Sequence, residues 1–214
     1  MKILNLYACL GGNRYKWGDK HEITAVEWDP ELARLYQERF PNDKVIVDDA
    51  HQYLLDHYKE FDFIWSSPPC PSHSRINISQ YTRENWKPKY PDMALYQEII
   101  FLEYYYKGKY CIENVIPFYD MLIPAKKRNR HLYWTNFNLP NILSERKNPD
   151  LSRTKNLVDA LSKFHDYDFR KYKGKQSMQK VARNLVDYKA GKTILDTVMG
   201  IEQSNNTNQL KIAI

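Results

Sequence analysis

The 214-residue sequence predicts an α/β fold with a mostly parallel β-sheet. Strand-like and helix-like segments alternate through the first half of the chain, which is the pattern of a parallel sheet covered by helices on both faces. Polar or glycine-rich residues follow the predicted strands, at the edge where open α/β sheets bind ligands. Hydrophobic residues make up 43% of the chain, which is enough to form a core.

Each element follows from its local pattern, taken in order along the chain. Apolar runs of strand length predict strands over 2–8, 21–28, 43–50, 61–67, 108–115 and 128–138. Apolar residues at helical spacing predict helices between them, over 29–40, 51–58 and 93–107, and a last helical segment over 181–201. Asp29 is expected to cap the first helix, with Pro30 in its first turn.

Charged residues are distributed unevenly along the chain. Residues 126–192 hold 17 Lys and Arg against 6 Asp and Glu, whereas the rest holds 15 against 20. We expect a catalytic or cofactor domain over 1–138, a small basic segment over 139–180 and a return to the first domain over 181–214. A basic half of this kind favours a polyanionic partner such as a nucleic acid.

Three further features narrow the class of protein. No apolar run approaches the roughly 20 residues of a membrane span. The apolar start is short and leads into a glycine pair, so we interpret it as a strand rather than a signal peptide and expect a cytoplasmic protein without a membrane partner. The spacing of the three cysteines matches no zinc site, and no metal is expected.

The ends of the first three predicted strands suggest a nucleoside pocket. Tyr7-Ala8-Cys9-Leu10-Gly11-Gly12 supplies a loop whose glycines permit a tight turn and a close approach to a ligand. After the second strand, Glu27 can bind ribose hydroxyls and Trp28 can lie against an adenine. Asp49, followed by Ala50, can accept a hydrogen bond from the adenine amino group.

The ends of the fourth and fifth strands carry groups suited to chemistry. Pro68, Pro69 and Pro71 surround Cys70 and predict a stiff, non-helical loop that presents a thiol. A thiol becomes a nucleophile when its pKa is lowered or a base assists it. Glu113 ends the fifth strand and can hold or share a proton with a ring nitrogen.

Two arginines follow further along the chain. Arg128 and Arg130 alternate, so they are expected to point the same way from a strand and to bind a carboxylate or a phosphate.

Together these segments resemble the cytosine-5 DNA methyltransferase family, in the family's order. YACLGG, VEWD and VDDAHQY resemble its cofactor motifs, and SPPCPSHS its Pro-Cys nucleophile loop. CIENV resembles the Glu-Asn-Val motif, KKRNRHLYW the Arg-x-Arg motif, and Arg183 to Val186 the last motif. The resemblance implies a Rossmann-like fold of the S-adenosylmethionine methyltransferases, with a small basic recognition lobe, S-adenosylmethionine as cofactor and no metal.

The resemblance also implies residue roles. Cys70 would attack C6 of a cytosine flipped out of duplex DNA, Glu113 would hold the base, Arg130 would brace both, and Arg128 would be structural or bind phosphate. The residues expected to line the cofactor site are Tyr7, Ala8, Cys9, Leu10, Gly11, Gly12, Glu27, Trp28, Asp49, Ala50, Pro68, Asn184 and Val186. The loop over 75–90 is expected to close over the base, and the enzyme to serve DNA methylation, as in restriction-modification.

Departures from the family pattern leave alternatives open. Cys9, Asn5, Lys126 and Arg183 stand where the family usually has glycine, aspartate, glutamine and glycine. The recognition segment is short, which leaves room for a tRNA substrate, a partner subunit or a homodimer. Ser67-Pro68-Pro69 also resembles the N4 or N6 amino methyltransferases, and an inactive nucleic-acid-binding relative is the non-enzymatic alternative.

Overall fold

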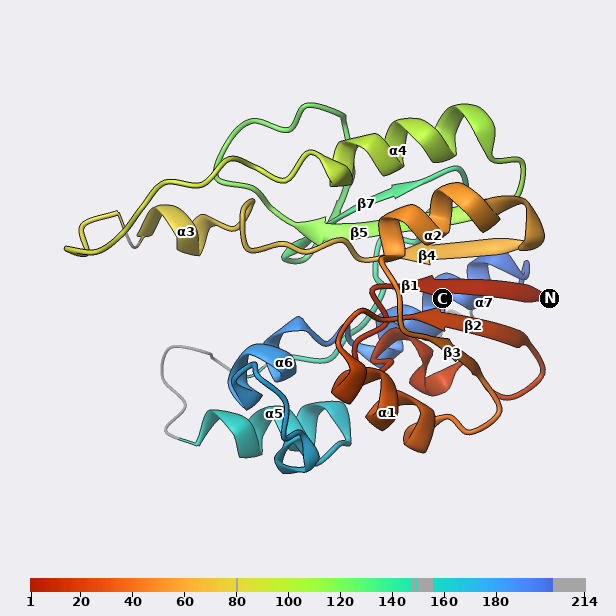
Figure 1. The fold of residues 1–214 in the computed structure, drawn as a ribbon. Helices are drawn as coiled ribbons and strands as arrows, with labels where there is room; N and C mark the ends of the chain where they lie inside the picture. The colour runs from red at the N-terminus through yellow and green to blue at the C-terminus, as the bar shows by residue number, and fades with distance from the viewer. Residues whose placement is uncertain (80, 148, 150–155, 202–214) are drawn as a thin grey trace, which may run out of the picture.

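The computed structural model describes residues 1–79, 81–147, 149 and 156–201, and these form a seven-stranded sheet (Figure 1). Its strands are β1 (Lys2–Leu6), β2 (Glu22–Val26), β3 (Lys44–Ile46), β4 (Phe63–Ser66), β5 (Lys109–Val115), β6 (Lys126–Arg128) and β7 (His131–Thr135). The spatial order is β3-β2-β1-β4-β5-β7-β6, and the first five strands run parallel. The predicted α/β class with a mostly parallel sheet is therefore confirmed.

Helices cover both faces of the sheet (Figure 1). The α-helices are α1 (Pro30–Arg39), α2 (Ala50–His57), α3 (Arg75–Ser79), α4 (Ala94–Tyr105), α5 (Leu157–His165), α6 (Met178–Asn184) and α7 (Tyr188–Val198). Short 3₁₀ turns are η1 (Asn13–Lys16), η2 (Tyr58–Glu60) and η3 (Phe169–Lys171). One core lies between the sheet and α2 and α4, and a second lies between the sheet and α7. Among the described residues, no helix is both long and apolar enough to cross a membrane.

The start of α1 agrees with its predicted signals. The side chain of Asp29 accepts hydrogen bonds from the backbone N–H groups of Glu31 and Leu32, and Pro30 is the first helical residue. Leu32, Leu35 and Tyr36 of this helix are buried. An N-cap of this kind contributes about 1 kcal/mol to stability.

Two predictions about the second half of the chain are confirmed in type, with different bounds. The strand expected within 128–138 is β7, and an unpredicted strand, β6, precedes it and pairs with it in a hairpin. Asn129 adopts a φ of 52° in the two-residue turn, a left-handed conformation that asparagine tolerates better than most residues. The helical segment expected over 181–201 contains the end of α6 and all of α7, which are separate helices because Leu185 is extended and Asp187 caps α7 with its side chain.

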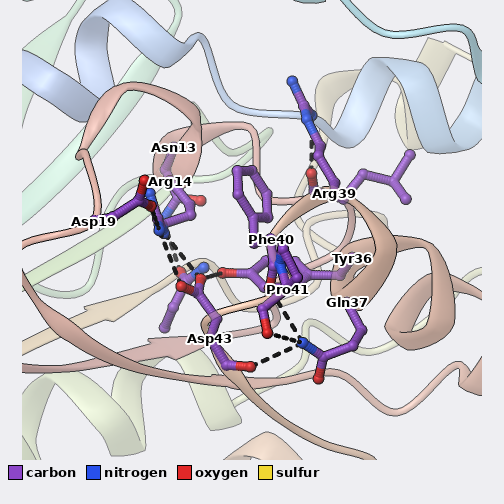
Figure 2. Close-up of polar contacts among 11 residues, drawn as sticks. Asn13, Arg14, Asp19, Tyr36, Gln37, Arg39, Phe40, Pro41 and Asp43 are labelled. Carbon is purple, nitrogen blue, oxygen red and sulfur yellow. Dashed lines mark hydrogen bonds and ion pairs between the residues drawn. The ribbon is translucent and has the colours of Figure 1, made fainter.

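The loop after β1 is fixed to the α1–β3 connection by a buried ion pair (Figure 2). Arg14 donates to both carboxylate oxygens of Asp43, at 2.8 and 2.9 Å, and Tyr36 adds a hydrogen bond at 2.9 Å. Arg39 donates to the carbonyl of Leu10 at 2.9 Å. Bidentate pairing satisfies charges whose burial would otherwise cost several kcal/mol.

Two segments project beyond the carboxyl ends of the parallel strands (Figure 1). The segment with α3 leaves from the end of β4, and α5 and α6 project from the other side. Leu157 and Leu161 of α5 and Val181 of α6 pack in one apolar cluster with Leu10 and Leu32. The basic segment is thereby joined to the loop after β1.

Candidate functional site

A cleft of about 360 Å³ lies at the carboxyl ends of the strands, within the size range of small-molecule sites. Most of the site residues predicted from the sequence line it: Tyr7, Ala8, Cys9, Gly12, Glu27, Trp28, Pro68, Cys70, Glu113, Arg128, Arg130, Asn184 and Val186. They come from positions far apart in the chain, and the crossover topology brings them together.

Cys70 lies in a loop that is fixed at both of its ends. The buried side chain of Asn114 donates a hydrogen bond to the carbonyl of Pro68 at 3.0 Å, which ties the loop to β5. The backbone N–H groups of His73 and Ser74 both donate to the carbonyl of Cys70 at 3.0 Å. The half-buried thiol is consequently presented to the cleft from a constrained backbone.

The surroundings of Cys70 keep its thiol protonated at neutral pH. Burial, and then the negative charge of Glu113, raise the pKa of Cys70 to about 11, while the positive charge of Lys180 opposes them. Lys180 lies on α6 and lines the cleft. Glu113 of β5 and Lys180 of α6 thus act in opposite directions on the thiol of Cys70.

Glu113 is 7% exposed, and its neighbour at the cleft is His131 of β7. Nε2 of His131 lies 3.7 Å from Oε1 of Glu113. This distance is that of an ion pair when the imidazole is protonated, and it is slightly longer than a hydrogen bond.

The two arginines of the β6–β7 hairpin lie differently from the prediction. They do not alternate along one strand, because Arg128 ends β6 and Arg130 lies in the turn. Arg128 donates to the carbonyls of Leu139 and Pro140, at 2.9 and 2.5 Å, and so holds the segment after β7. Arg130 is exposed at the rim of the cleft.

Glu27 fixes the loop after β1 from the end of β2. Its two carboxylate oxygens accept hydrogen bonds from the backbone N–H groups of Cys9, at 2.8 Å, and Asp29, at 3.0 Å. Burial raises the pKa of Glu27. Trp28, beside it, is 69% exposed and offers an aromatic face at the cleft.

Gly12 brings the C-terminal segment against the same loop. A Cβ built on Gly12 would lie 2.4 Å from the backbone oxygen of Val186, so only glycine allows this approach. The neighbouring Cys9 adopts a φ of 48°, and burial raises the pKa of its thiol. A left-handed conformation at this position accounts for the glycine that the family usually has there.

Four predicted cofactor residues lie outside the cleft lining. Leu10 and Gly11 are buried on the side of the loop away from the cleft lining, and a Cβ on Gly11 would collide with Phe40 at 2.4 Å. Asp49 caps α2 by accepting hydrogen bonds from the N–H groups of His51 and Gln52, and Ala50 is buried in the first turn of this helix. Their cofactor contacts remain predictions.

The structure also reveals a buried carboxylate that sequence reasoning missed. Glu98 of α4 is 1% exposed. It accepts hydrogen bonds from Tyr7 at 2.5 Å and Ser66 at 2.6 Å, and it lies 3.1 Å from Nδ1 of His51. It therefore ties the ends of β1 and β4 to α2. Glu98 stands within an apolar helical stretch, and that isolated charge was the available signal.

His131 and Lys180 were missed for a different reason. Neither lies in a recognisable pattern, because a histidine beside an Arg-x-Arg sequence and one lysine in a basic segment look like ordinary surface residues. Only strand pairing and the docking of α6 bring them to the cleft.

Comparison with known proteins identifies the family. The profile of the family described as C-5 cytosine-specific DNA methylase matches residues 1–120, more than half of the sequence. The chain belongs to this family. The match includes the loop after β1, Cys70 and Glu113, and it ends before the β6–β7 hairpin. No curated protein matches the chain.

Solved structures provide more distant likenesses. A triple mutant of Spodoptera frugiperda DNMT2 is 27% identical, with a TM-score of 0.39 over 53% of this chain and 35% of that protein. The Entamoeba histolytica methyltransferase EhMeth is 14% identical, with a TM-score of 0.36 over 54% and 38% of the two chains.

A TehB-like SAM-dependent methyltransferase from Corynebacterium glutamicum is 21% identical, with a TM-score of 0.32 over 53% and 54% of the two chains. The chain thus spans about a third of the insect and amoebal proteins and about half of the bacterial one. Because each TM-score is below 0.5, the family assignment rests on the sequence match alone.

The cleft suits the nucleoside-containing methyl donor that a methylase requires. The buried carboxylate of Glu27 and the exposed ring of Trp28 are adjacent at one part of the cleft lining. Gly12 leaves space that a Cβ would fill, and Asn184 and Val186 line the cleft beside it. A carboxylate for ribose hydroxyls and an aromatic face for adenine are the groups that such a ligand needs.

Proposed function

We propose that this protein is an S-adenosylmethionine-dependent DNA methyltransferase that methylates carbon 5 of a cytosine flipped out of the duplex. One observation supports this most directly: the thiol of Cys70 and the carboxyl of Glu113 face one cleft together with the glycine loop and Glu27. A nucleophile, a proton-bearing group and a nucleoside site within one cleft match the needs of carbon-5 methylation.

Cys70 performs the covalent step in this proposal. Its thiolate adds to C6 of the cytosine, which saturates the 5,6 bond and makes C5 electron-rich. S-adenosylmethionine, when bound, supplies an electrophilic methyl group. A base then removes the C5 proton, the bond between C6 and Sγ of Cys70 breaks, and the 5,6 double bond returns with Cys70 released as thiolate.

Glu113 binds the edge of the base in this proposal. A protonated carboxyl donates a hydrogen bond to N3, and this bond stabilises the negative charge that develops as Cys70 adds. Because Asn114 ties the Cys70 loop to β5, the thiol and the carboxyl keep a fixed relation to the same ring. Arg130 is exposed at the rim, and in this proposal it contacts a phosphate or the base when DNA is bound.

Residues of the glycine loop and the strand ends hold the cofactor in this proposal. Glu27 binds the ribose hydroxyls and Trp28 covers the adenine. Gly12, Asn184 and Val186 border the remaining part of the site. The cap of α2 uses the Oδ1 atom of Asp49. We therefore keep the proposed role of Asp49, in which its second carboxylate oxygen accepts a hydrogen bond from the adenine amino group.

The two projecting segments are proposed to bind the nucleic acid. The exposed lysines of the basic segment include Lys147, Lys163, Lys173 and Lys175. Such side chains neutralise phosphates and make affinity depend strongly on salt. The segment with α3 follows the Cys70 loop and carries exposed Ile76 and Ile78. In this proposal it covers the flipped base, whose extrusion costs a few kcal/mol.

Covalent trapping tests the function. Duplex DNA containing 5-fluorocytosine is incubated with the protein and S-adenosylmethionine. Because fluorine replaces the C5 proton that a base must remove, the bond between Cys70 and C6 should persist. Peptide mapping then identifies the residue that is bonded to the DNA. Cys70→Ala should abolish the adduct, whereas Cys111→Ala, which truncates a fully buried thiol outside the cleft lining, should retain it.

Other results of these experiments would point to the alternative functions. Methyl transfer by Cys70→Ala would indicate amino methylation and overturn the carbon-5 chemistry. Adduct formation on tRNA but not on DNA would overturn the DNA substrate alone. Failure to bind S-adenosylmethionine in calorimetry would indicate an inactive relative.

A further inference from the structure

His131 and Glu113 lie on the same face of neighbouring strands. β5 and β7 pair antiparallel, with Glu113 opposite Tyr133 and His131 opposite Val115. His131 is therefore the diagonal neighbour of Glu113, a relation that long side chains can bridge. Both side chains line the cleft, and their facing atoms are 3.7 Å apart.

Several other titratable groups line the cleft or lie beside Glu113 in the sheet. By element they are Cys70 in the loop after β4, Cys111 on β5, Tyr133 on β7, Arg128 and Arg130 at the hairpin, and Lys180 on α6. Burial raises the pKa values of Cys70, Cys111 and Tyr133, so these groups stay neutral at pH 7. Within the part of the chain that the structure describes, His131 is the one basic side chain with a nitrogen within 4 Å of a Glu113 carboxylate oxygen.

Glu113 needs a proton to bind cytosine as proposed. An ionised carboxylate only accepts hydrogen bonds, and N3 of cytosine is itself an acceptor. The two would repel each other unless a proton lay between them. His131 is adjacent to Glu113, is 32% exposed in its side chain and can exchange protons with solvent at the rim.

We propose that His131 is a positioning residue that orients Glu113 and supplies the proton that Glu113 presents to the cytosine ring. This inference rests on the proposed function and assigns the bracing of Glu113 to His131 rather than to Arg130. The Nε2–H bond of the imidazolium breaks and an O–H bond forms at Oε1 of Glu113, which leaves a neutral imidazole and a protonated carboxyl. The carboxyl then donates to N3 while Cys70 adds to C6.

The test measures the single-turnover rate of adduct formation on 5-fluorocytosine DNA from pH 6 to 9, with cofactor affinity measured by calorimetry. The variants are His131→Asn and His131→Gln, each checked by thermal melting. The matched control is His57→Asn, because His57 forms an exposed pair with Glu60 at 2.7 Å on α2, outside the cleft lining.

We expect both His131 variants to form the adduct about 10- to 100-fold more slowly, with cofactor affinity unchanged. The pH dependence of their rates should differ from that of the wild type, because Glu113 then lacks its neighbouring proton donor. In a Glu113→Gln background, His131→Asn should cause no further loss.

Wild-type rates and a wild-type pH profile in the His131 variants would overturn this inference alone. An equal loss from His131→Asn in the Glu113→Gln background would also overturn it, because the effect would then not pass through Glu113. A wild-type protein that forms no adduct on any nucleic acid would overturn the proposed function and this inference with it.

Discussion

At the scale of single residues, Cys70 combines a constrained backbone with a protonated thiol. Burial and Glu113 raise its pKa to about 11, so the free protein holds little thiolate at pH 7. In the proposed mechanism, a proton on Glu113 at the bound base removes the unfavourable charge beside the sulfur, so that Cys70 becomes reactive when the substrate is in place.

The raised pKa predicts how Cys70 reacts with iodoacetamide. Below pH 11 the thiolate fraction, and with it the alkylation rate, should rise about tenfold per pH unit. Glu113→Gln removes a negative charge, lowers the pKa of Cys70 and should speed its alkylation at pH 8. Mass spectrometry of the labelled peptide measures both effects. A rate that levels off below pH 9, or no acceleration in Glu113→Gln, would contradict the burial and charge assigned to Cys70.

At the scale of elements, the cofactor loop depends on close packing against its neighbours. Gly12 meets the extended linker between α6 and α7, and Arg39 of α1 holds the carbonyl of Leu10. The linker is fixed in turn by Asp187, which caps α7 and pairs with Arg146 at 2.7 Å. The C-terminal helices therefore complete the cleft as well as covering the sheet.

Gly12→Ala tests this contact. The added Cβ would lie 2.4 Å from the Val186 oxygen, a backbone atom that cannot move by a side-chain rotation. We expect unfolding free energy to fall by about 1–3 kcal/mol and cofactor affinity to fall about tenfold or more. Calorimetry and urea unfolding measure the two quantities.

Gly18→Ala serves as the control for this substitution. Gly18 has a φ of 75° but no neighbouring atom within 4 Å of an added Cβ. The Gly18→Ala substitution should lower the free energy of unfolding by about 1 kcal/mol and leave cofactor affinity unchanged. Equal cofactor affinities for Gly12→Ala and the wild type would refute the close approach.

At the scale of the whole molecule, the end of α5 fixes the basic segment to α1. The carbonyl of His165 at its end accepts from Arg39, and its buried ring packs edge-on against Phe164 and Phe169. Burial lowers the pKa of His165 to about 4, and the positive charges of Arg146 and Arg39 act in the same direction. The folded protein therefore requires a neutral imidazole at this junction.

Acid should destabilise the fold through His165. Its pKa is about 4 in the folded state and about 6.5 in the unfolded chain, so the unfolded state binds more protons between these values. Protonation of His165 in the unfolded chain should lower the free energy of unfolding by about 2 kcal/mol between pH 7 and pH 5. Urea unfolding at the two pH values, compared with His165→Phe, isolates the contribution. An equal pH dependence in both proteins would contradict it.

The sequence by itself determined the fold class, most element positions and the main chemical groups. Alternating apolar runs predicted β1 to β5, and the capping residues Asp29 and Pro30 predicted the start of α1, because these signals depend on near neighbours. The proline-bounded Cys70 and the strand-ending Glu113 were recognisable for the same reason, and the structure places both at the cleft.

Tertiary structure alone decided which other groups meet at the cleft. Antiparallel pairing of β7 with β5 brings His131 to Glu113, docking of α6 brings Lys180 toward Cys70, and α4 buries Glu98 beneath β1 and β4. The hairpin turn at Asn129 separates Arg128 from Arg130. Each outcome depends on contacts between residues distant in sequence, whose positions follow from packing of the whole chain rather than from any local pattern.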